Sequence, residues 1–134
     1  MDTNILMYAA GKDSCYKIPC SEILKKADDL NNIYFINTET IQEILYRYTY
    51  LNLRDFACTF ALDVINLFEN ILLIDVEDVS LAVSLLKKYD FLMSRDALIA
   101  ANMVDNNIKN IISADKVFDR IEEVRRIDPL KKLN

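Results

Sequence analysis

The 134-residue sequence contains no histidine, and this absence excludes several kinds of catalytic site. A Ser-His-Asp triad, a Cys-His pair and zinc held by histidine all need an imidazole ring. The only glycine is Gly11. A phosphate-binding P-loop and a G-x-G-x-x-G dinucleotide turn are therefore also excluded, because each needs several glycines. The side chains that remain for chemistry carry oxygen ligands, which suit magnesium or manganese.

Cysteines and long apolar runs are also scarce. Cys15, Cys20 and Cys58 form no C-x-x-C motif and are odd in number, which is typical of thiols in a reducing compartment. No apolar run reaches the roughly eighteen residues of a membrane span. No basic segment followed by a long apolar one marks a signal peptide. We therefore expect a cytoplasmic protein without a membrane segment, folded as a single domain over residues 1–134.

The net charge of −5 is unfavourable for binding RNA, whose phosphates are contacted by lysine and arginine. Two bound divalent cations carry four positive charges and would reduce this charge from −5 to −1. Basic pairs also lie apart from the acidic residues, at Lys25-Lys26, Lys87-Lys88 and Arg125-Arg126. Most of these pairs are typical of solvated surfaces.

Short apolar segments alternate with amphipathic ones along the whole chain. Strands are expected at 1–6, 33–36, 71–74, 111–112 and 124–127. Helices are expected at 19–32, 40–50, 54–68, 79–89, 94–104 and 115–123. Strands that alternate with helices predict an α/β fold with a mostly parallel, roughly five-stranded sheet.

Two carboxylates open helices in the C-terminal half of the chain. We expect Ser94 to cap a helix, which places Asp96 in its first turn. Asp115 follows a short buried strand and begins the next helix. Taken singly, each acid is typical of a helix N-terminus, where the dipole favours negative charge.

Two further acids lie near the expected carboxyl ends of strands or the starts of helices. Asp2 lies in the N-terminal apolar segment and Glu43 near the start of a helix. In a doubly wound α/β fold these ends face one crevice, so Asp2, Glu43, Asp96 and Asp115 are predicted to converge there. For Glu43 a second interpretation stays open, because Thr40 to Glu43 also fits a capping box. Glu39 is the alternative acid in that region.

Five segments, taken in order, resemble the PIN domain family, especially the VapC-type toxins. The opening Met1-Asp2-Thr3-Asn4-Ile5-Leu6 is similar to D-T-N-V-L, and 38–46 is similar to the segment that carries the family's glutamate. The helix start R-D-A-L-I-A-A at 95–101 is close to D-A-L-I-A-A. Residues 113–118 fit T-x-D-x-x-F with serine for threonine, and 126–130 resemble the closing strand.

The resemblance implies a PIN-like three-layer α/β/α sandwich and a metal-dependent ribonuclease. It implies that Asp2, Glu43, Asp96 and Asp115 are the metal and catalytic acids, with Asn4 and Ser113 as supporting groups. Two departures stand out. The family's first strand precedes its aspartate, whereas here only Met1 precedes Asp2. Many members have a further aspartate where this chain has Val117, and Asp119 lies a helical turn away from the site.

Four carboxylates in one crevice repel each other unless cations accompany them. A magnesium or manganese ion held there lowers the pKa of a bound water, which predicts hydrolysis of RNA by water rather than by a ribose hydroxyl. The resemblance further implies a VapB-like antitoxin as a partner and a homodimer formed partly by the helices at 40–50 and 54–68. Tyr46, Tyr48 and Tyr50, beside Arg47, suit either base stacking or a core or dimer surface.

Two other classes of function compete with the ribonuclease. The first is a catalytically weak PIN-like module that acts by binding a partner, which the short N-terminus and Val117 favour. The second is another magnesium-dependent α/β protein. A haloacid-dehalogenase-type phosphatase needs D-x-D after its first strand, but Asp2-Thr3-Asn4 lacks the second acid. A receiver domain needs acids after its first strand to accompany an aspartate such as Asp75, and those acids are absent.

Overall fold

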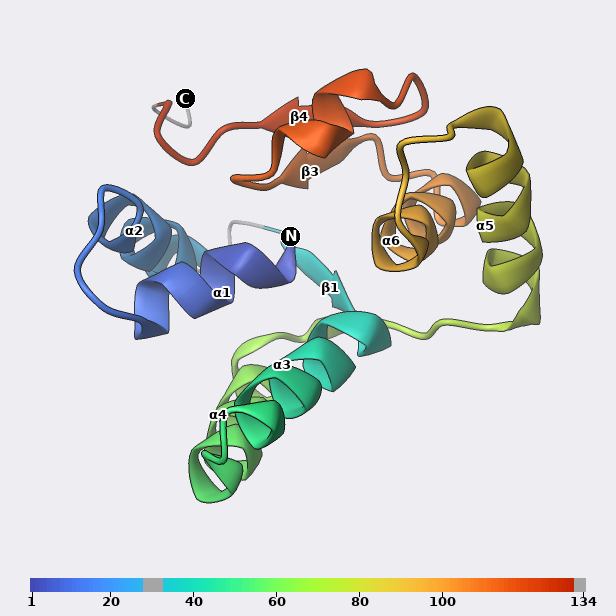
Figure 1. The fold of residues 1–134 in the computed structure, drawn as a ribbon. Helices are drawn as coiled ribbons and strands as arrows, with labels where there is room; N and C mark the ends of the chain where they lie inside the picture. Colours follow the sequence, from blue (N-terminus) through green and yellow to red (C-terminus); the bar gives the residue numbers. More distant parts are fainter. Residues whose placement is uncertain (28–32, 132–134) are drawn as a thin grey trace.

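The computed structural model of the protein describes residues 1–27 and 33–131. The fold consists of three pairs of helices together with short strands, and β3 and β4 lie at one edge of it (Figure 1). The helices pack as α1 (Thr3–Ala10) with α2 (Lys17–Ala27), α3 (Thr38–Tyr50) with α4 (Arg54–Leu67), and α5 (Val76–Lys88) with α6 (Ser94–Asp105). Within the described ranges, no helix is long and apolar enough to cross a membrane.

The strands form two separate sheets rather than one. β1 (Phe35–Asn37) pairs in parallel with β2 (Asn70–Leu72), and β3 (Asn110–Ile112) pairs in parallel with β4 (Arg125–Ile127). The predicted α/β class with parallel strands is confirmed. The single sheet of about five strands is not observed: the part of the chain that the structure describes forms two sheets of two strands each.

The strand predicted at 1–6 is wrong, because helix α1 begins at Thr3. Ile5 and Leu6 are both fully buried, but they pack into different apolar clusters. A helix can turn two successive apolar side chains toward two neighbouring clusters on one broad face. Over so short a segment, the apolar residues of such a helix also fit the continuous apolar run of a buried strand.

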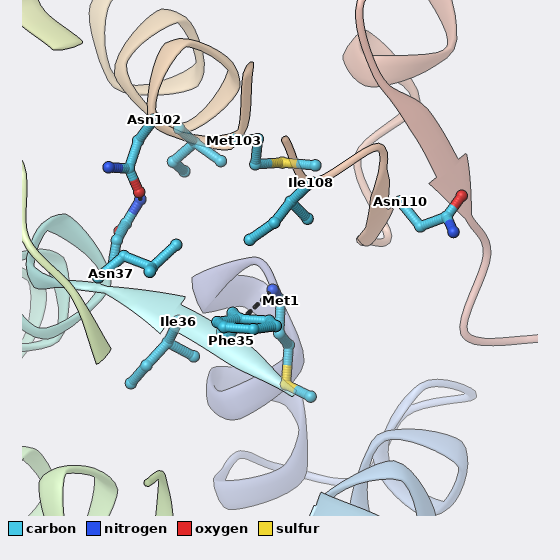
Figure 2. A pocket seen from close by; sticks show the side chains of 10 residues that line it. Met1, Phe35, Ile36, Asn37, Asn102, Met103, Ile108 and Asn110 are labelled. Atoms are coloured by element: carbon cyan, nitrogen blue, oxygen red, sulfur yellow. Dashed lines mark hydrogen bonds between the residues drawn. The ribbon is translucent and has the colours of Figure 1, made fainter. Parts of the chain in front are cut away.

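Met1 and Asp2 lie between the two sheets. The Met1 nitrogen donates a hydrogen bond of 2.6 Å to the carbonyl oxygen of Phe35 in β1 (Figure 2). The Asp2 amide donates one of 3.0 Å to the carbonyl oxygen of Ile112 in β3. Met1 and Asp2, from the segment predicted as a strand, therefore connect the two sheets through one hydrogen bond each. A small cavity next to this connection is lined by residues of both sheets and of α6 (Figure 2).

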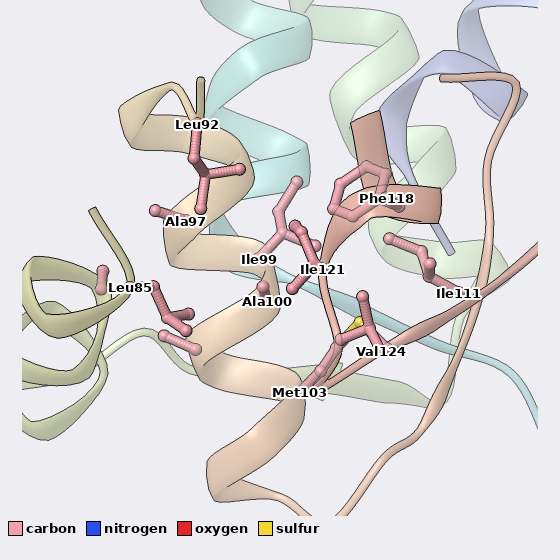
Figure 3. Packing of buried hydrophobic residues seen from close by; sticks show 12 residues of the cluster. Leu85, Leu92, Ala97, Ile99, Ala100, Met103, Ile111, Phe118, Ile121 and Val124 are labelled. Carbon is pink, nitrogen blue, oxygen red and sulfur yellow. The ribbon is translucent and has the colours of Figure 1, made fainter. Parts of the chain in front are cut away.

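The largest apolar cluster surrounds α6 and holds it in place (Figure 3). Ala97, Ala100 and Ala101 are completely buried on this helix, and such small side chains let neighbouring elements approach closely. Phe118 from the 3₁₀ helix η1 (Lys116–Arg120) and Ile111 from β3 are also completely buried in the cluster. Burial of each large side chain contributes about 1.5–3 kcal/mol to the stability of the fold. The packing of this cluster therefore fixes the position of the start of α6.

Two predicted caps and the predicted length of one helix differ from those observed. Ser94 does not cap α6, since Met93 holds the N-cap position and makes no side-chain cap bond. Thr40 does not begin a capping box either: the Asn37 side chain caps α3 by accepting a hydrogen bond of 3.1 Å from the Thr40 amide. The helix predicted at 115–123 is instead the five-residue η1. Asp75 caps α5 by accepting a hydrogen bond from the Asp78 amide, and this helix begins at Val76 rather than at the predicted 79.

A buried polar network joins the starts of α3 and α5 to the last turn of α6. Asn102 is fully buried on α6 and donates hydrogen bonds of 2.9 Å to a carboxylate oxygen of Asp78 and to the carbonyl oxygen of Leu73. Its own side-chain oxygen accepts a bond of 3.3 Å from the cap residue Asn37. These long-range hydrogen bonds fix the relative positions of α3, α5 and α6, although the buried Asp78 Oδ1 atom has no hydrogen-bond partner among the described residues. The predicted helix end near 30–32 lies outside the described residues.

Candidate active site

One open pocket brings together the four acids that the sequence nominated. Its lining consists of Asp2, Asn4, Met7, Glu43, Met93, Ser94, Arg95, Asp96 and Asp115. The acids come from four places: the N-cap of α1, the second turn of α3, the first turn of α6 and the N-cap of η1. Three of the four thus lie at or next to helix N-termini, where the helix dipole favours negative charge.

Asp2 is the most firmly held of these carboxylates. It is almost completely buried, and its Oδ2 atom accepts a hydrogen bond of 2.5 Å from the Asn4 side chain. The Ser113 hydroxyl donates a second, short bond to the same oxygen. Asn4 also donates to the Ser113 hydroxyl at 3.0 Å. Asn4 and Ser113, nominated as supporting groups, therefore fix the orientation of Asp2.

Further hydrogen bonds tie this supporting pair to the last sheet. The Asp115 amide donates to the Ser113 hydroxyl at 2.9 Å, and the Ala114 amide donates to Asn4 Oδ1 at 3.2 Å. The buried guanidinium of Arg126 donates a bond of 3.0 Å to the Ser113 carbonyl oxygen. Arg126 thus supports the site through Ser113, a role that no local sequence pattern indicates.

Asp96 lies where negative charge is most crowded. Burial raises its pKa to about 6, and the charges of Asp2, Asp115 and Glu43 add to this effect, while Arg95 opposes it. Burial also raises the pKa of Asp2, although the hydrogen bond from Ser113 acts in the opposite direction. Carboxyl groups that resist ionisation in the absence of a cation are characteristic of functional sites.

Arg95 is the one basic residue in the lining of this pocket, and sequence reasoning missed it. Its Nη1 atom lies 3.3 Å from Glu43 Oε1, and its Nε atom lies 3.4 Å from Glu39 Oε1. The guanidinium also lies 4.8 Å from the centre of the Tyr46 ring. The sequence signal for Arg95 is its position next to Asp96 in the R-D-A-L motif at the start of α6. A charged residue beside a candidate metal ligand at a helix start is placed near the same pocket.

The acids that the sequence offered as alternatives lie outside the pocket lining. Glu39 pairs with Arg95, and burial raises its pKa. Asp119 forms two bonds of 2.9 Å with Arg126, whose guanidinium lowers the pKa of that carboxyl. Asp75 is occupied in the cap of α5. Val117 is half-buried and packs against the large apolar cluster.

The donor set fits a divalent cation that prefers oxygen ligands. Four carboxylates and an amide oxygen share the pocket, and neither thiol nor imidazole is among its lining groups. Within residues 1–27 and 33–131, however, no three acidic or cysteine side chains are gathered into a preformed metal cluster. Arg95 holds Glu43, and Asp115 accepts a bond from the Val117 amide. Mutual repulsion also favours separation of these carboxylates until a cation joins them.

The fold and the pocket together define a small α/β domain with a carboxylate-lined site at the starts of its helices. The sequence profile of the PIN domain matches residues 1–124, so the chain belongs to the PIN domain family. Within that family it resembles the VapC-type ribonucleases. It is 31% identical over 128 residues to a VapC ribonuclease of Mycobacterium bovis and, equally, to ribonuclease VapC13 of Mycobacterium tuberculosis. Each alignment covers 95% of this chain and 97% of the relative.

A solved structure has the same fold. The structure of VapBC2 from Rickettsia felis, bound to a DNA fragment from its promoter, contains a chain that superposes with a TM-score of 0.68. The match covers 93% of both chains at 18% sequence identity. At this identity the likeness concerns the fold.

Proposed function

We propose that this protein is a metal-dependent endoribonuclease that hydrolyses RNA phosphodiester bonds. The observation that carries the proposal is the convergence of Asp2, Glu43, Asp96 and Asp115 on one pocket from four separate elements. Relatives named as VapC ribonucleases, similar over 95% of the chain, support the same activity.

In this proposal the four acids would hold magnesium or manganese. A divalent cation bound by carboxylates lowers the pKa of an attacking water and stabilises negative charge on phosphate oxygens. The chain's own contribution is orientation: Asn4 and Ser113 fix Asp2 through three hydrogen bonds among the three side chains. Supporting groups of this kind set the direction in which a ligand's lone pairs point.

Attack by water, rather than by the neighbouring ribose hydroxyl, gives the proposal a chemical test. In this proposal the nucleophile is the water that the bound cation would activate, so the ribose hydroxyl takes no part in the attack. We therefore expect products without a 2′,3′-cyclic phosphate. A substrate with a single deoxyribose at the cleavage position should be cut as well as all-RNA substrate.

The decisive experiment incubates purified protein with structured RNA in EDTA, magnesium or manganese. We expect cleavage in the presence of either metal and none in EDTA. Asp96→Asn should abolish it, whereas the matched control Asp63→Asn, which removes an exposed acid on α4, should cleave normally. Equal cleavage by the native protein and Asp96→Asn would refute the assignment of the pocket.

We further propose that the protein is the toxin of a VapBC-type toxin–antitoxin pair in the cytoplasm, as a homodimer with a VapB-like antitoxin as its partner. The likeness to a chain of a VapBC complex supports the pairing. Leu62 and Ile65 on α4 are 60% and 41% exposed and lie one helical turn apart, which suits a protein contact. Light scattering of the purified protein, alone and with its partner, tests this assembly.

A second candidate is a catalytically weak PIN-like module that acts through partner binding. It is favoured by the lack of a preformed metal cluster among the described residues, and by the ion pair between Glu43 and Arg95. Manganese titration followed by calorimetry separates the two functions. Binding that disappears in Asp96→Asn supports the nuclease, while no heat of binding by the native protein supports the partner-binding module.

A further inference from the structure

The three tyrosines near the end of α3 do not share one environment. Tyr48 is half-buried and packs edge-on against Phe56 and Phe60, with ring centres 4.8 and 5.8 Å away. Tyr46 and Tyr50 instead point outward, with 52% and 73% of their surface exposed. The predicted cluster therefore divides into one core residue and two surface residues.

The two exposed rings form a continuous row with Arg95. Tyr46 and Tyr50 lie one turn apart on α3, with ring centres 6.2 Å apart and planes inclined by 21°. The Arg95 guanidinium lies 4.8 Å from the centre of the Tyr46 ring. Since Arg95 also lines the acidic pocket, the row begins at the pocket and continues outward along α3.

From this arrangement we infer that Arg95, Tyr46 and Tyr50 form the surface that receives an unpaired nucleotide beside the scissile phosphate. The inference rests on the proposed ribonuclease function and specifies its substrate as RNA with a single-stranded segment at the cleavage site. Arg95 contacts a backbone phosphate, and the tyrosine rings stack on the adjoining base. Only unpaired bases present a free face for such stacking.

Charge supports a nucleic-acid ligand at this place. A phosphate that enters a pocket lined by four carboxylates needs a positive group, and Arg95 is the one basic side chain in the lining. Its contacts with Glu43 and Glu39 measure 3.3 and 3.4 Å, longer than the roughly 2.7–2.9 Å of a strong charge-assisted bond. Within residues 1–27 and 33–131, its Nη2 atom makes no hydrogen bond. A guanidinium held this weakly can exchange one carboxylate for a phosphate, which it binds with two parallel bonds.

The test measures binding separately from cleavage. A short single-stranded oligoribonucleotide that contains 2-aminopurine is titrated with protein in calcium, and a gel verifies that the RNA stays intact. Stacking on an aromatic side chain quenches 2-aminopurine fluorescence. We expect quenching with the single strand and none with the same sequence in a duplex. Arg95→Gln and Tyr46→Leu should each weaken binding roughly tenfold or more, and Tyr46→Leu should remove the quenching.

Two control variants make the result specific. Tyr46→Phe keeps the ring and should retain both affinity and quenching. Tyr8→Leu disrupts a different stacked pair, Tyr8 with Tyr16 at 4.7 Å, which is not part of the pocket lining, and it should bind like the native protein. Since Tyr46 and Tyr50 are largely exposed, their substitutions should leave the melting temperature nearly unchanged.

Three results would overturn the inference. If native protein cleaves RNA with metal while Arg95→Gln and Tyr46→Leu bind normally, this surface is not the nucleotide site, and the ribonuclease function stands. If Tyr46→Leu converts a dimer into a monomer of unchanged RNA affinity, the tyrosines serve a protein interface. If native protein neither binds nor cleaves RNA with any cation, the proposed function itself fails and the inference fails with it.

Discussion

Replacement of Asp96 by asparagine should stabilise the metal-free protein while it abolishes activity. Burial and the charges of Asp2, Asp115 and Glu43 raise the pKa of Asp96 to about 6. In the unfolded chain an aspartate has a pKa of about 4. Ionisation of Asp96 therefore opposes folding, and Asp96→Asn removes that opposition with little change in the size of the side chain.

The size of the effect follows from the displacement of the pKa. A pKa change of one corresponds to a free energy of about 1.4 kcal/mol. A rise in the pKa of Asp96 from about 4 to about 6 therefore lowers the free energy of unfolding by at most about 3 kcal/mol. Asp96 is only partly buried at the pocket wall, and solvent screening reduces this figure by about half. We expect Asp96→Asn to raise the free energy of unfolding by about 1.5 kcal/mol at pH 7.5, or about 5 °C in melting temperature.

The sign of the pH dependence is also determined. Because the folded-state pKa lies above the unfolded one, the destabilisation is absent below about pH 4 and complete above about pH 6. The advantage of Asp96→Asn should therefore fall to about half its size at pH 5. Manganese should reverse the order at pH 7.5, since it stabilises only a protein that binds it.

The assay is urea denaturation of both proteins at pH 5 and pH 7.5, in EDTA and in manganese. Asp63→Asn serves as the control, because it removes one negative charge at an exposed position away from the pocket. Two results would refute the proposed repulsion between Asp96 and the other acids. One is an Asp96→Asn variant that is less stable than the native protein in EDTA at pH 7.5. The other is a difference in stability that does not change with pH.

Three further predictions concern the site and its support. Glu43→Gln should reduce the rate of RNA cleavage roughly 100-fold or more. Glu39 lies outside the pocket lining, so Glu39→Gln should change this rate less than about twofold. Similar losses in both variants would place Glu39 in the site as well. Ser113→Ala removes the hydroxyl that binds Asp2 and should weaken manganese binding about 10–100-fold by calorimetry, with an unchanged affinity arguing against a supporting role. Asn102→Ala removes the side-chain donor to the Leu73 carbonyl and one of the two donors to Asp78 Oδ2, the other being the Asp75 amide. It should lower the free energy of unfolding by about 2–3 kcal/mol. The exposed Asn66→Ala should change it by less than about 0.5 kcal/mol, and equal effects would refute the network's contribution.

Local sequence patterns were enough to predict most of the helices and to identify the four candidate acids. The apolar spacing of 54–68 and 94–104 depends on near neighbours along the chain, and these two helices are found where expected. The helix predicted at 79–89 is also present, but its cap Asp75 lets it begin at Val76. The ordered PIN-like segments named the family and placed Asp2, Glu43, Asp96 and Asp115 together. The sequence profile over residues 1–124 confirms the family, and the pocket contains all four acids.

Tertiary contacts decided what local patterns leave open. Ile5 and Leu6 suit either a buried strand or a helix between two clusters, and the clusters are formed by residues distant in sequence. Glu43 fits a capping box locally, but Asn37 takes the cap because a long-range bond to Asn102 already holds it there.

The pairing of Arg95 with Glu43 and the support of Ser113 by Arg126 likewise join residues 52 and 13 positions apart. By itself, the sequence determined which acids are available for chemistry, and it assigned Glu43 and Asp96 to the helices that carry them. The tertiary structure alone decided which groups hold those acids, because hydrogen bonds and charges act across space rather than along the chain.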